Sequence, residues 1–144
     1  MYFLLNRSPD GILLLSQSNP IVLNSVESMQ FNGPLYLVDY TITGYPVNGN
    51  NEAEESCVFA ELETRGSLFL ADQFSLDSRY RKGTFPILMT GTGTVSHQSY
   101  TLPGLKISNH FNTGAIKNIK LRLYKSNNYP LSFKSAAFLF YVND

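Results

Sequence analysis

The chain has 144 residues, of which 43% are hydrophobic and 15% are charged. This length allows one sizeable core and is too short for two ordinary domains, so we expect a single domain over residues 1–144. The 11 basic and 11 acidic residues cancel, which leaves no global field toward nucleic acid or an anionic membrane, and no nucleic-acid partner is expected.

Cysteine content and the amino-terminal residues predict synthesis in the cytoplasm. The one cysteine, Cys57, cannot form an internal disulfide, so nothing points to an oxidising compartment. The apolar run after Met1 has no basic residue before it and is too short for a signal peptide or a membrane span. We therefore expect a protein that is not secreted and has no membrane span.

Short segments with strand character follow one another from the amino terminus. After residues 1–6, turn signals rich in Pro, Asn and Gly introduce residues 12–15 and residues 21–23. Residues 24–30 fit either a short helical turn, because Asn24 is a good cap, or a strand. No segment has the pattern of a long amphipathic helix, and this rhythm is typical of a β-sandwich.

The strongest early strand covers residues 35–43. Alternation predicts that one of its faces holds four large apolar side chains, those of Tyr36, Val38, Tyr40 and Ile42. The opposite face is more polar, so we expect the strand to be half-buried.

Two further pairs of strands are predicted in the middle of the chain. Residues 57–63 and 68–74 are expected to pair with each other across a short turn. Residues 84–89 and 95–102 flank Gly91-Thr92-Gly93, which lacks the Lys-Ser/Thr pair of a phosphate-binding loop. This motif therefore predicts a hairpin turn.

The last quarter of the chain has the clearest strand pattern. Ile119, Leu121 and Leu123 share one face of a strand over residues 116–124. A polar turn with two Asn and one Pro follows, so a second strand over residues 133–142 is predicted to run back as a hairpin. The total of about eight strands predicts an all-β fold, an antiparallel β-sandwich with jelly-roll topology.

Two charged segments are candidate surface features. The polar residues 46–56 predict a long flexible loop, and we take four of its side chains as exposed: Asn50, Glu52, Glu54 and Glu55. The only concentrated basic patch is Arg79-Tyr80-Arg81-Lys82, whose three charges favour contact with another subunit over binding to a genome.

No motif predicts catalysis or metal binding. Ser96 and His97 are adjacent on a predicted strand, so their side chains point to opposite faces and are poorly placed to share a proton. His97, His110 and Cys57 are too few and too scattered for a zinc site. We therefore expect a protein that is not an enzyme and needs no cofactor or metal.

The carboxy-terminal segment resembles the terminal hairpin of jelly-roll virion proteins, namely penton and minor capsid proteins of double-stranded DNA viruses of the virophage, Polinton and giant-virus kind. The residues that carry the resemblance are the alternating strand Ile116-Lys117-Asn118-Ile119-Lys120-Leu121-Arg122-Leu123-Tyr124, the turn Asn127-Asn128-Tyr129, the segment Pro130-Leu131-Ser132-Phe133 and the closing strand Ala137-Phe138-Leu139-Phe140-Tyr141-Val142. In place of the usual acidic or Gly-containing turn, this chain has two Asn and a Tyr.

The resemblance implies a structural component of a virus capsid, made in the host-cell cytoplasm and built into the virion. Its implied partners are copies of itself, with a pentamer favoured and a trimer as alternative, and other capsid proteins. With 9 Tyr and 10 Phe, the chain has aromatic side chains to spare for such contacts. Candidate subunit-contact residues are Phe3, Tyr80, Tyr100 and Phe111, together with Arg79 and Arg81.

Two other classes of function remain open. One is a binding module, such as the trimeric receptor-binding head of a viral fibre or a tumour-necrosis-factor-like domain, with residues 46–56 as the recognition loop. The other is a cupin-like enzyme or small-ligand protein, against which the scarcity of histidine argues.

Overall fold

The computed structural model describes residues 2–7, 21–29, 32–64, 67–69, 84–112 and 116–142. These residues form strands and no helix. The strands are β1 (Tyr2–Arg7), β2 (Ile21–Met29), β3 (Asn32–Thr43), β4 (Cys57–Thr64), β5 (Ser67–Phe69), β6 (Phe85–Leu88), β7 (Val95–Ser99), β8 (Leu105–Asn112), β9 (Ile116–Tyr124) and β10 (Ser135–Val142). Residues 24–29, which fitted helix or strand, belong to β2.

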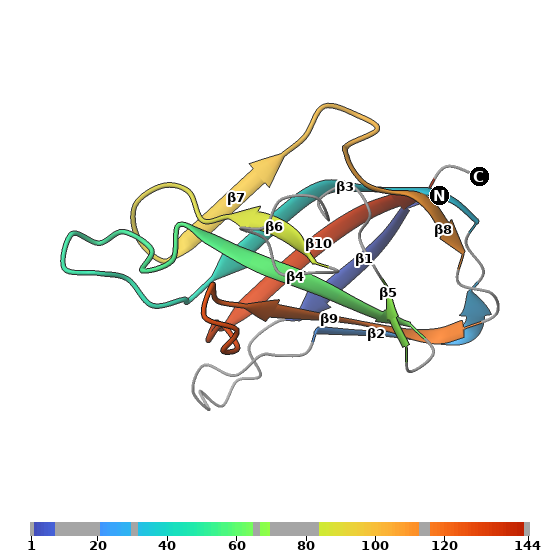
Figure 1. Ribbon diagram of the computed structural model, residues 1–144, viewed down its shortest axis with the longest axis horizontal. Coiled ribbons are helices and arrows are strands. Elements are labelled where there is room, and N and C mark those ends of the chain that lie inside the picture. Colours follow the sequence, from blue (N-terminus) through green and yellow to red (C-terminus); the bar gives the residue numbers. More distant parts are fainter. Residues whose placement is uncertain are drawn as a thin grey trace.

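The strands form two antiparallel sheets (Figure 1). In sheet 1 the order is β1-β10-β3, followed by β7 and β8, which pair with successive parts of β3. In sheet 2 the order is β2-β9-β4, followed by β5 and β6, which pair with successive parts of β4. The ten described strands thus fill eight positions, four in each sheet.

One core cluster lies between the two sheets. Phe85 of sheet 2 meets Phe140 of sheet 1 edge to face, with 6.3 Å between ring centroids. Tyr40 of sheet 1 donates its hydroxyl to the backbone oxygen of Leu88 in sheet 2 at 2.8 Å, and burial raises the pKa of this hydroxyl. These contacts confirm the predicted antiparallel β-sandwich.

The carboxy-terminal strands are confirmed, but the predicted hairpin is wrong. Ile119, Leu121 and Leu123 are fully buried, and the side chains of β10 alternate strictly between buried and half-buried positions. However, β9 pairs with β2 and β4 in sheet 2, whereas β10 pairs with β1 and β3 in sheet 1. Alternation reports a strand and its buried face, but carries no information about the partner strand.

The link between β6 and β7 also differs from the prediction. Gly91-Thr92-Gly93 does not close a hairpin, because β6 belongs to sheet 2 and β7 to sheet 1, and the chain crosses between the layers there. By contrast, β4 and β5 do pair antiparallel, as predicted.

A β-bulge changes the expected inner face of β3. The register against β10 shifts between the pairs Leu139–Asp39 and Phe140–Leu37, so Val38 is an extra residue. Leu35 and Leu37 therefore face the core before the bulge, and Tyr40 and Ile42 face it afterwards. The predicted single face running from Tyr36 to Ile42 is wrong for Tyr36, which is half-buried, whereas Val38 is buried at the bulge.

Candidate functional site

Two of the predicted subunit-contact residues belong to the core. Phe3 is 7% exposed and Phe111 is 1% exposed, and their rings stack with 6.5 Å between centroids. A contact anchor needs accessible area, so this prediction is wrong for both residues. Each lies on the inward face of its strand. Residues 2–5 of β1 are apolar on both faces, so this part of the sequence has no polar side to mark the outer face.

Tyr100 lies at the margin of the core. It is half-buried and packs against the core cluster, with its ring centroid 6.4 Å from that of Tyr40. Burial raises the pKa of its hydroxyl. Arg79, Tyr80 and Arg81 lie outside the described residues, so their role in subunit contact stays a prediction.

The loop at residues 46–56 projects from one end of the sandwich (Figure 1). The side-chain oxygen of Asn48 accepts hydrogen bonds from the backbone amides of Asn50 at 2.9 Å and Glu52 at 3.1 Å. The loop also bonds the neighbouring crossover, because Gly93 donates its amide to the backbone oxygen of Asn51. These bonds give the loop a defined turn.

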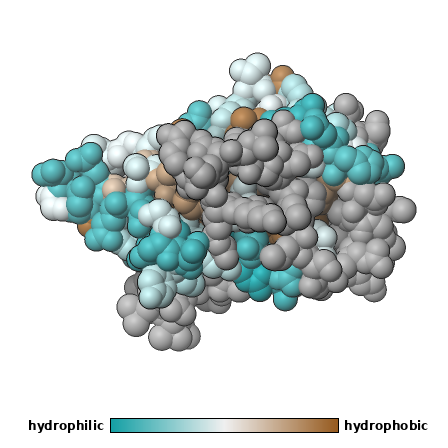
Figure 2. Space-filling view, in the orientation of Figure 1, coloured by the Kyte–Doolittle hydropathy of each residue, from teal (hydrophilic) through white to brown (hydrophobic). Residues whose placement is uncertain are grey.

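The side chains of this loop divide into exposed and half-buried ones. Asn50, Glu52 and Glu54 are exposed, whereas Glu55 is half-buried and accepts a hydrogen bond from the Ser126 hydroxyl at 3.3 Å. Figure 2 shows hydrophilic colours over this end of the molecule. Three of the four predicted exposed side chains are therefore accessible, and the fourth contributes to loop packing.

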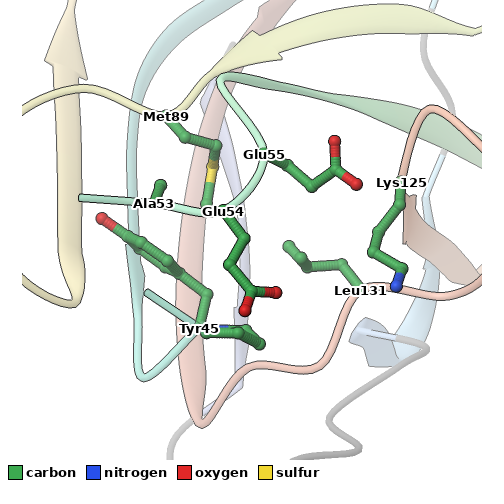
Figure 3. Close-up of a pocket in the computed structure, with 8 residues that line it drawn as sticks. Tyr45, Ala53, Glu54, Glu55, Met89, Lys125 and Leu131 are labelled. Atoms are coloured by element: carbon green, nitrogen blue, oxygen red, sulfur yellow. The ribbon is translucent and has the colours of Figure 1, made fainter. Parts of the chain in front are cut away.

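A small pocket lies beneath the loop (Figure 3). It is lined by Tyr45, Pro46, Ala53, Glu54, Glu55, Met89, Lys125 and Leu131. The accessible space holds about one water molecule. Pockets for small-molecule substrates are usually of about 300–1,000 Å³, so this hollow does not fit a substrate.

Three polar side chains converge on the outer face of sheet 1. Nε2 of His97 lies 3.1 Å from Oδ2 of Asp39, and the Ser99 hydroxyl donates to the same carboxylate oxygen. Oγ of Ser99 is 3.4 Å from Nε2 of His97. The prediction that Ser96 and His97 point to opposite faces is confirmed, because Ser96 is buried and its hydroxyl is hydrogen-bonded to that of Tyr45 at 2.7 Å, whereas His97 is exposed.

The geometry of this cluster is not that of a hydrolase triad. In a triad the carboxylate holds one ring nitrogen of the histidine and the serine uses the other. Here Asp39 and Ser99 both approach Nε2 of His97, and the serine hydroxyl is bonded to the carboxylate itself. The cluster is also on an open sheet face, where the His97 side chain is 56% exposed. It therefore acts as a cross-strand polar contact between β3 and β7.

Neither a metal cluster nor a membrane-spanning helix is present in the part of the chain that the structure describes. No three or more His, Cys, Asp or Glu side chains of these residues are grouped as metal ligands. None of the same residues form a helix long and apolar enough to cross a bilayer.

The outer face of sheet 1 has side chains in rows that cross the strands. The first row, here called the tyrosine row, is Tyr2, Tyr141, Tyr36 and Lys106. The second, the leucine row, is Leu4, Leu139, Asp39 and Ser99. The third is polar apart from one alanine: Asn6, Ala137, Thr41 and His97.

In the first two rows exposed and half-buried apolar side chains lie next to one another, whereas exposed Val95 of β7 lies apart from them, beyond the third row. Tyr2 is 52% exposed and Leu4 is 46% exposed, while Tyr36, Leu139 and Tyr141 are half-buried. The tyrosines touch one another, with centroids 4.9 Å apart for Tyr2 and Tyr141 and 6.2 Å apart for Tyr36 and Tyr141. Sequence reasoning missed this surface, because its apolar residues come from three strands, β1, β3 and β10, that are far apart in the chain.

An ion pair on sheet 2 makes stability depend on pH. Arg122 donates a hydrogen bond from Nη1 to Oε2 of Glu63, and this bond lowers the pKa of the Glu63 carboxyl below its ordinary value of about 4.5. The stabilisation is complete above that ordinary value and is lost as the pH falls through the lowered value.

We therefore expect the difference in free energy of unfolding between the wild type and Arg122→Gln to be largest at neutral pH and to shrink in acid. Urea unfolding at a series of pH values measures it. In a Glu63→Gln background the same Arg122→Gln comparison should lose this acid dependence. A difference that is constant with pH in the wild-type background would contradict the assignment.

Comparisons with protein-family models, with curated proteins and with solved structures find no match.

Proposed function

We propose that the chain is a jelly-roll structural protein of a virus capsid, of the penton or minor capsid type. The observation that carries the proposal is the strand order. Successive strands β1 to β4 alternate between the two sheets, and so do β9 and β10. β10 lies between β1 and β3, while β9 lies between β2 and β4. This order supports a jelly roll, a fold found in viral capsid and lectin domains.

The surface adds support for a protein that assembles. Large apolar side chains are exposed at the edge strand β1, where Tyr2 and Leu4 lie beside Tyr141 and Leu139 of β10. Exposed apolar side chains that gather in one place are typical of protein–protein contact sites. In this proposal the protein is made in the host-cell cytoplasm, becomes part of the virion and contacts other copies and other capsid proteins.

The absolute mass of the purified protein at low concentration tests the proposal. We expect a closed pentamer of the 16.2 kDa chain, because a vertex requires five-fold closure. Size-exclusion chromatography with light scattering measures this mass. A monomer that also fails to co-purify with a major capsid protein would contradict the proposal.

The defined loop at residues 46–56 favours one second candidate, a trimeric receptor-binding head. Its exposed side chains Asn50, Glu52 and Glu54 project from one end of the sandwich, where such heads meet a receptor. A trimer by light scattering, together with binding to cells or to a glycan array, would favour this function over the capsid role. Loss of that binding on replacing the three side chains with alanine would assign it to the loop.

A further inference from the structure

The strongest unassigned feature is the pair of rows on the outer face of sheet 1. β1, β10 and β3 lie side by side in this sheet (Figure 1). The tyrosine and leucine rows occupy one end of its outer face, and the polar third row follows. The boundary is sharp on β1 itself, where Leu4 and Asn6 are both exposed and are neighbours on the same face. The apolar area is thus a bounded patch.

The two rows are chemically complementary to each other. Position by position from β1, the tyrosine row is aromatic, aromatic, aromatic and cationic. The leucine row is aliphatic, aliphatic, anionic and polar. Aromatic rings pack well on aliphatic side chains, and both a phenol hydroxyl and an ammonium group can donate to a carboxylate. The side chains of one row can therefore pack on, and form hydrogen bonds or ion pairs with, those of the other row.

We propose that this patch binds the same patch of a second copy of the chain. The two copies are related by a two-fold axis. This axis is parallel to the sheet, perpendicular to its strands and lies between the two rows, so the tyrosine row of each copy faces the leucine row of the other. Tyr2 and Tyr141 of one copy then cover the partner's Leu4 and the partner's Leu139. The contact is isologous, so both halves are made by the same residues.

The charges at the rim suit this arrangement. In this arrangement Tyr36 lies over the partner's Asp39. Lys106 lies one strand spacing, about 4.8 Å, to the side of the same carboxylate. Within one copy the ammonium of Lys106 lies 5.8 Å from the Tyr36 ring centroid, so the ammonium is held beside the patch. Cation and anion thus alternate around the axis, and like charges do not face each other.

The size of the patch sets the expected strength. Two rows of four side chains per copy belong to the small class of interfaces, below about 1,200 Å² in total. We expect a dissociation constant on the order of 10 μM, so association rises with concentration. The contact is two-fold and therefore goes beyond the proposed function, which needs a five-fold contact for a vertex.

The first test compares two lysine substitutions on the same strand face. Leu4→Lys puts a charge inside the patch, whereas Asn6→Lys puts the same charge two residues further along β1, outside it. We expect the average mass of the wild type and of Asn6→Lys to rise with concentration, and Leu4→Lys to raise the dissociation constant at least tenfold. Sedimentation equilibrium measures this, and circular dichroism confirms that each variant is folded.

The second test uses charge reversal and mixing. In a dimer of Lys106→Glu chains, the new carboxylate lies beside the partner's Asp39. In a dimer of Asp39→Lys chains, the new ammonium lies beside the partner's Lys106. Each like-charge contact occurs twice, so each variant should associate more weakly than the wild type. An equimolar mixture of the two variants can form a mixed dimer, in which both contacts of position 106 with position 39 join opposite charges. We therefore expect the mixture to associate more tightly than either variant alone. Asp39→Lys also removes the carboxylate that contacts His97 and Ser99, in every chain of its own sample and in half of the chains of the mixture, so the mixture has to associate more tightly than both single variants.

Three results would overturn the inference. The first is a wild type whose mass does not rise with concentration. The second is an equal effect of Leu4→Lys and Asn6→Lys, and the third is a mixture that associates no better than its components. If the protein is a pentamer and Leu4→Lys leaves its mass unchanged at every concentration, this contact is overturned while the capsid proposal stands. Concentration-dependent pairing of a chain that forms no pentamer and does not co-purify with a major capsid protein would overturn the capsid proposal and leave this contact standing.

Discussion

Replacing Phe140 with alanine lowers the free energy of unfolding by about 4 kcal/mol. The ring is fully buried in β10 and contacts both layers of the sandwich. It stacks on Phe3 with 5.1 Å between centroids and meets Phe85 edge to face at 6.3 Å. The substitution removes the transfer free energy of the ring and leaves a cavity that the facing sheets cannot close without moving.

Urea unfolding followed by circular dichroism measures this loss, with Tyr129→Ala as the matched control. Tyr129 is 66% exposed in the turn after β9, so its truncation should change the free energy of unfolding by no more than about 0.5 kcal/mol. The slope of the Phe140→Ala transition should match that of the wild type, because the surface exposed on unfolding is nearly the same. Equal midpoints for the two variants would contradict the central role of this ring.

Local pattern was sufficient to predict much of the fold. Alternation of large apolar and polar side chains over residues 116–124 identified both the strand and its buried face, because a strand half covered by a core needs that period. Pairing could not be predicted in the same way. Whether β10 pairs with β9 or with β1 and β3 depends on contacts between residues far apart in the chain. The hairpin prediction failed for this reason.

The bulge in β3 had no local signal either. Val38 is as good a strand residue as its neighbours, and no glycine or proline marks the place where the register against β10 shifts. One inserted residue moves Tyr36 to the outer face and brings Leu35 and Leu37 into the core. The tyrosine row exists because of this shift.

The candidate surfaces were harder to predict than the strands. The exposed side chains of the loop at residues 46–56 could be predicted from its polar composition. Asp39, His97 and Ser99 meet because β3 and β7 pair, although Asp39 and His97 are 58 residues apart. β1 presents apolar side chains to both faces, so only the structure separates buried Phe3 from exposed Tyr2 and Leu4. In most strands a polar face opposite an apolar one identifies the side that packs on the core, and residues 2–5 lack this difference.

Replacing Gly104 with alanine should cost about 3 kcal/mol, although the change adds only one methyl group. Gly104 has φ of +123°, a region that L side chains rarely adopt. A Cβ atom there would lie 2.5 Å from the backbone oxygen of Leu37 and 3.2 Å from Cβ of Tyr36. Both neighbours belong to β3, whose backbone is paired on either side by β10 and β8. The clash therefore cannot be relieved by turning a flexible side chain.

Gly49→Ala is the control for this effect, because it makes the same chemical change where no atom lies within 4 Å of the added Cβ. The free energy of unfolding of that variant should lie within about 1 kcal/mol of the wild-type value. A small gain in stability is expected where alanine reduces the conformational freedom of the unfolded chain. Thermal and urea unfolding of the two variants measure the contrast. Since Gly104 precedes β8, its strain should also loosen Lys106 beside Tyr36, and Gly104→Ala should weaken the concentration-dependent association along with the fold. Equal stability of the two alanine variants would mean that the turn before β8 has room to move away from β3.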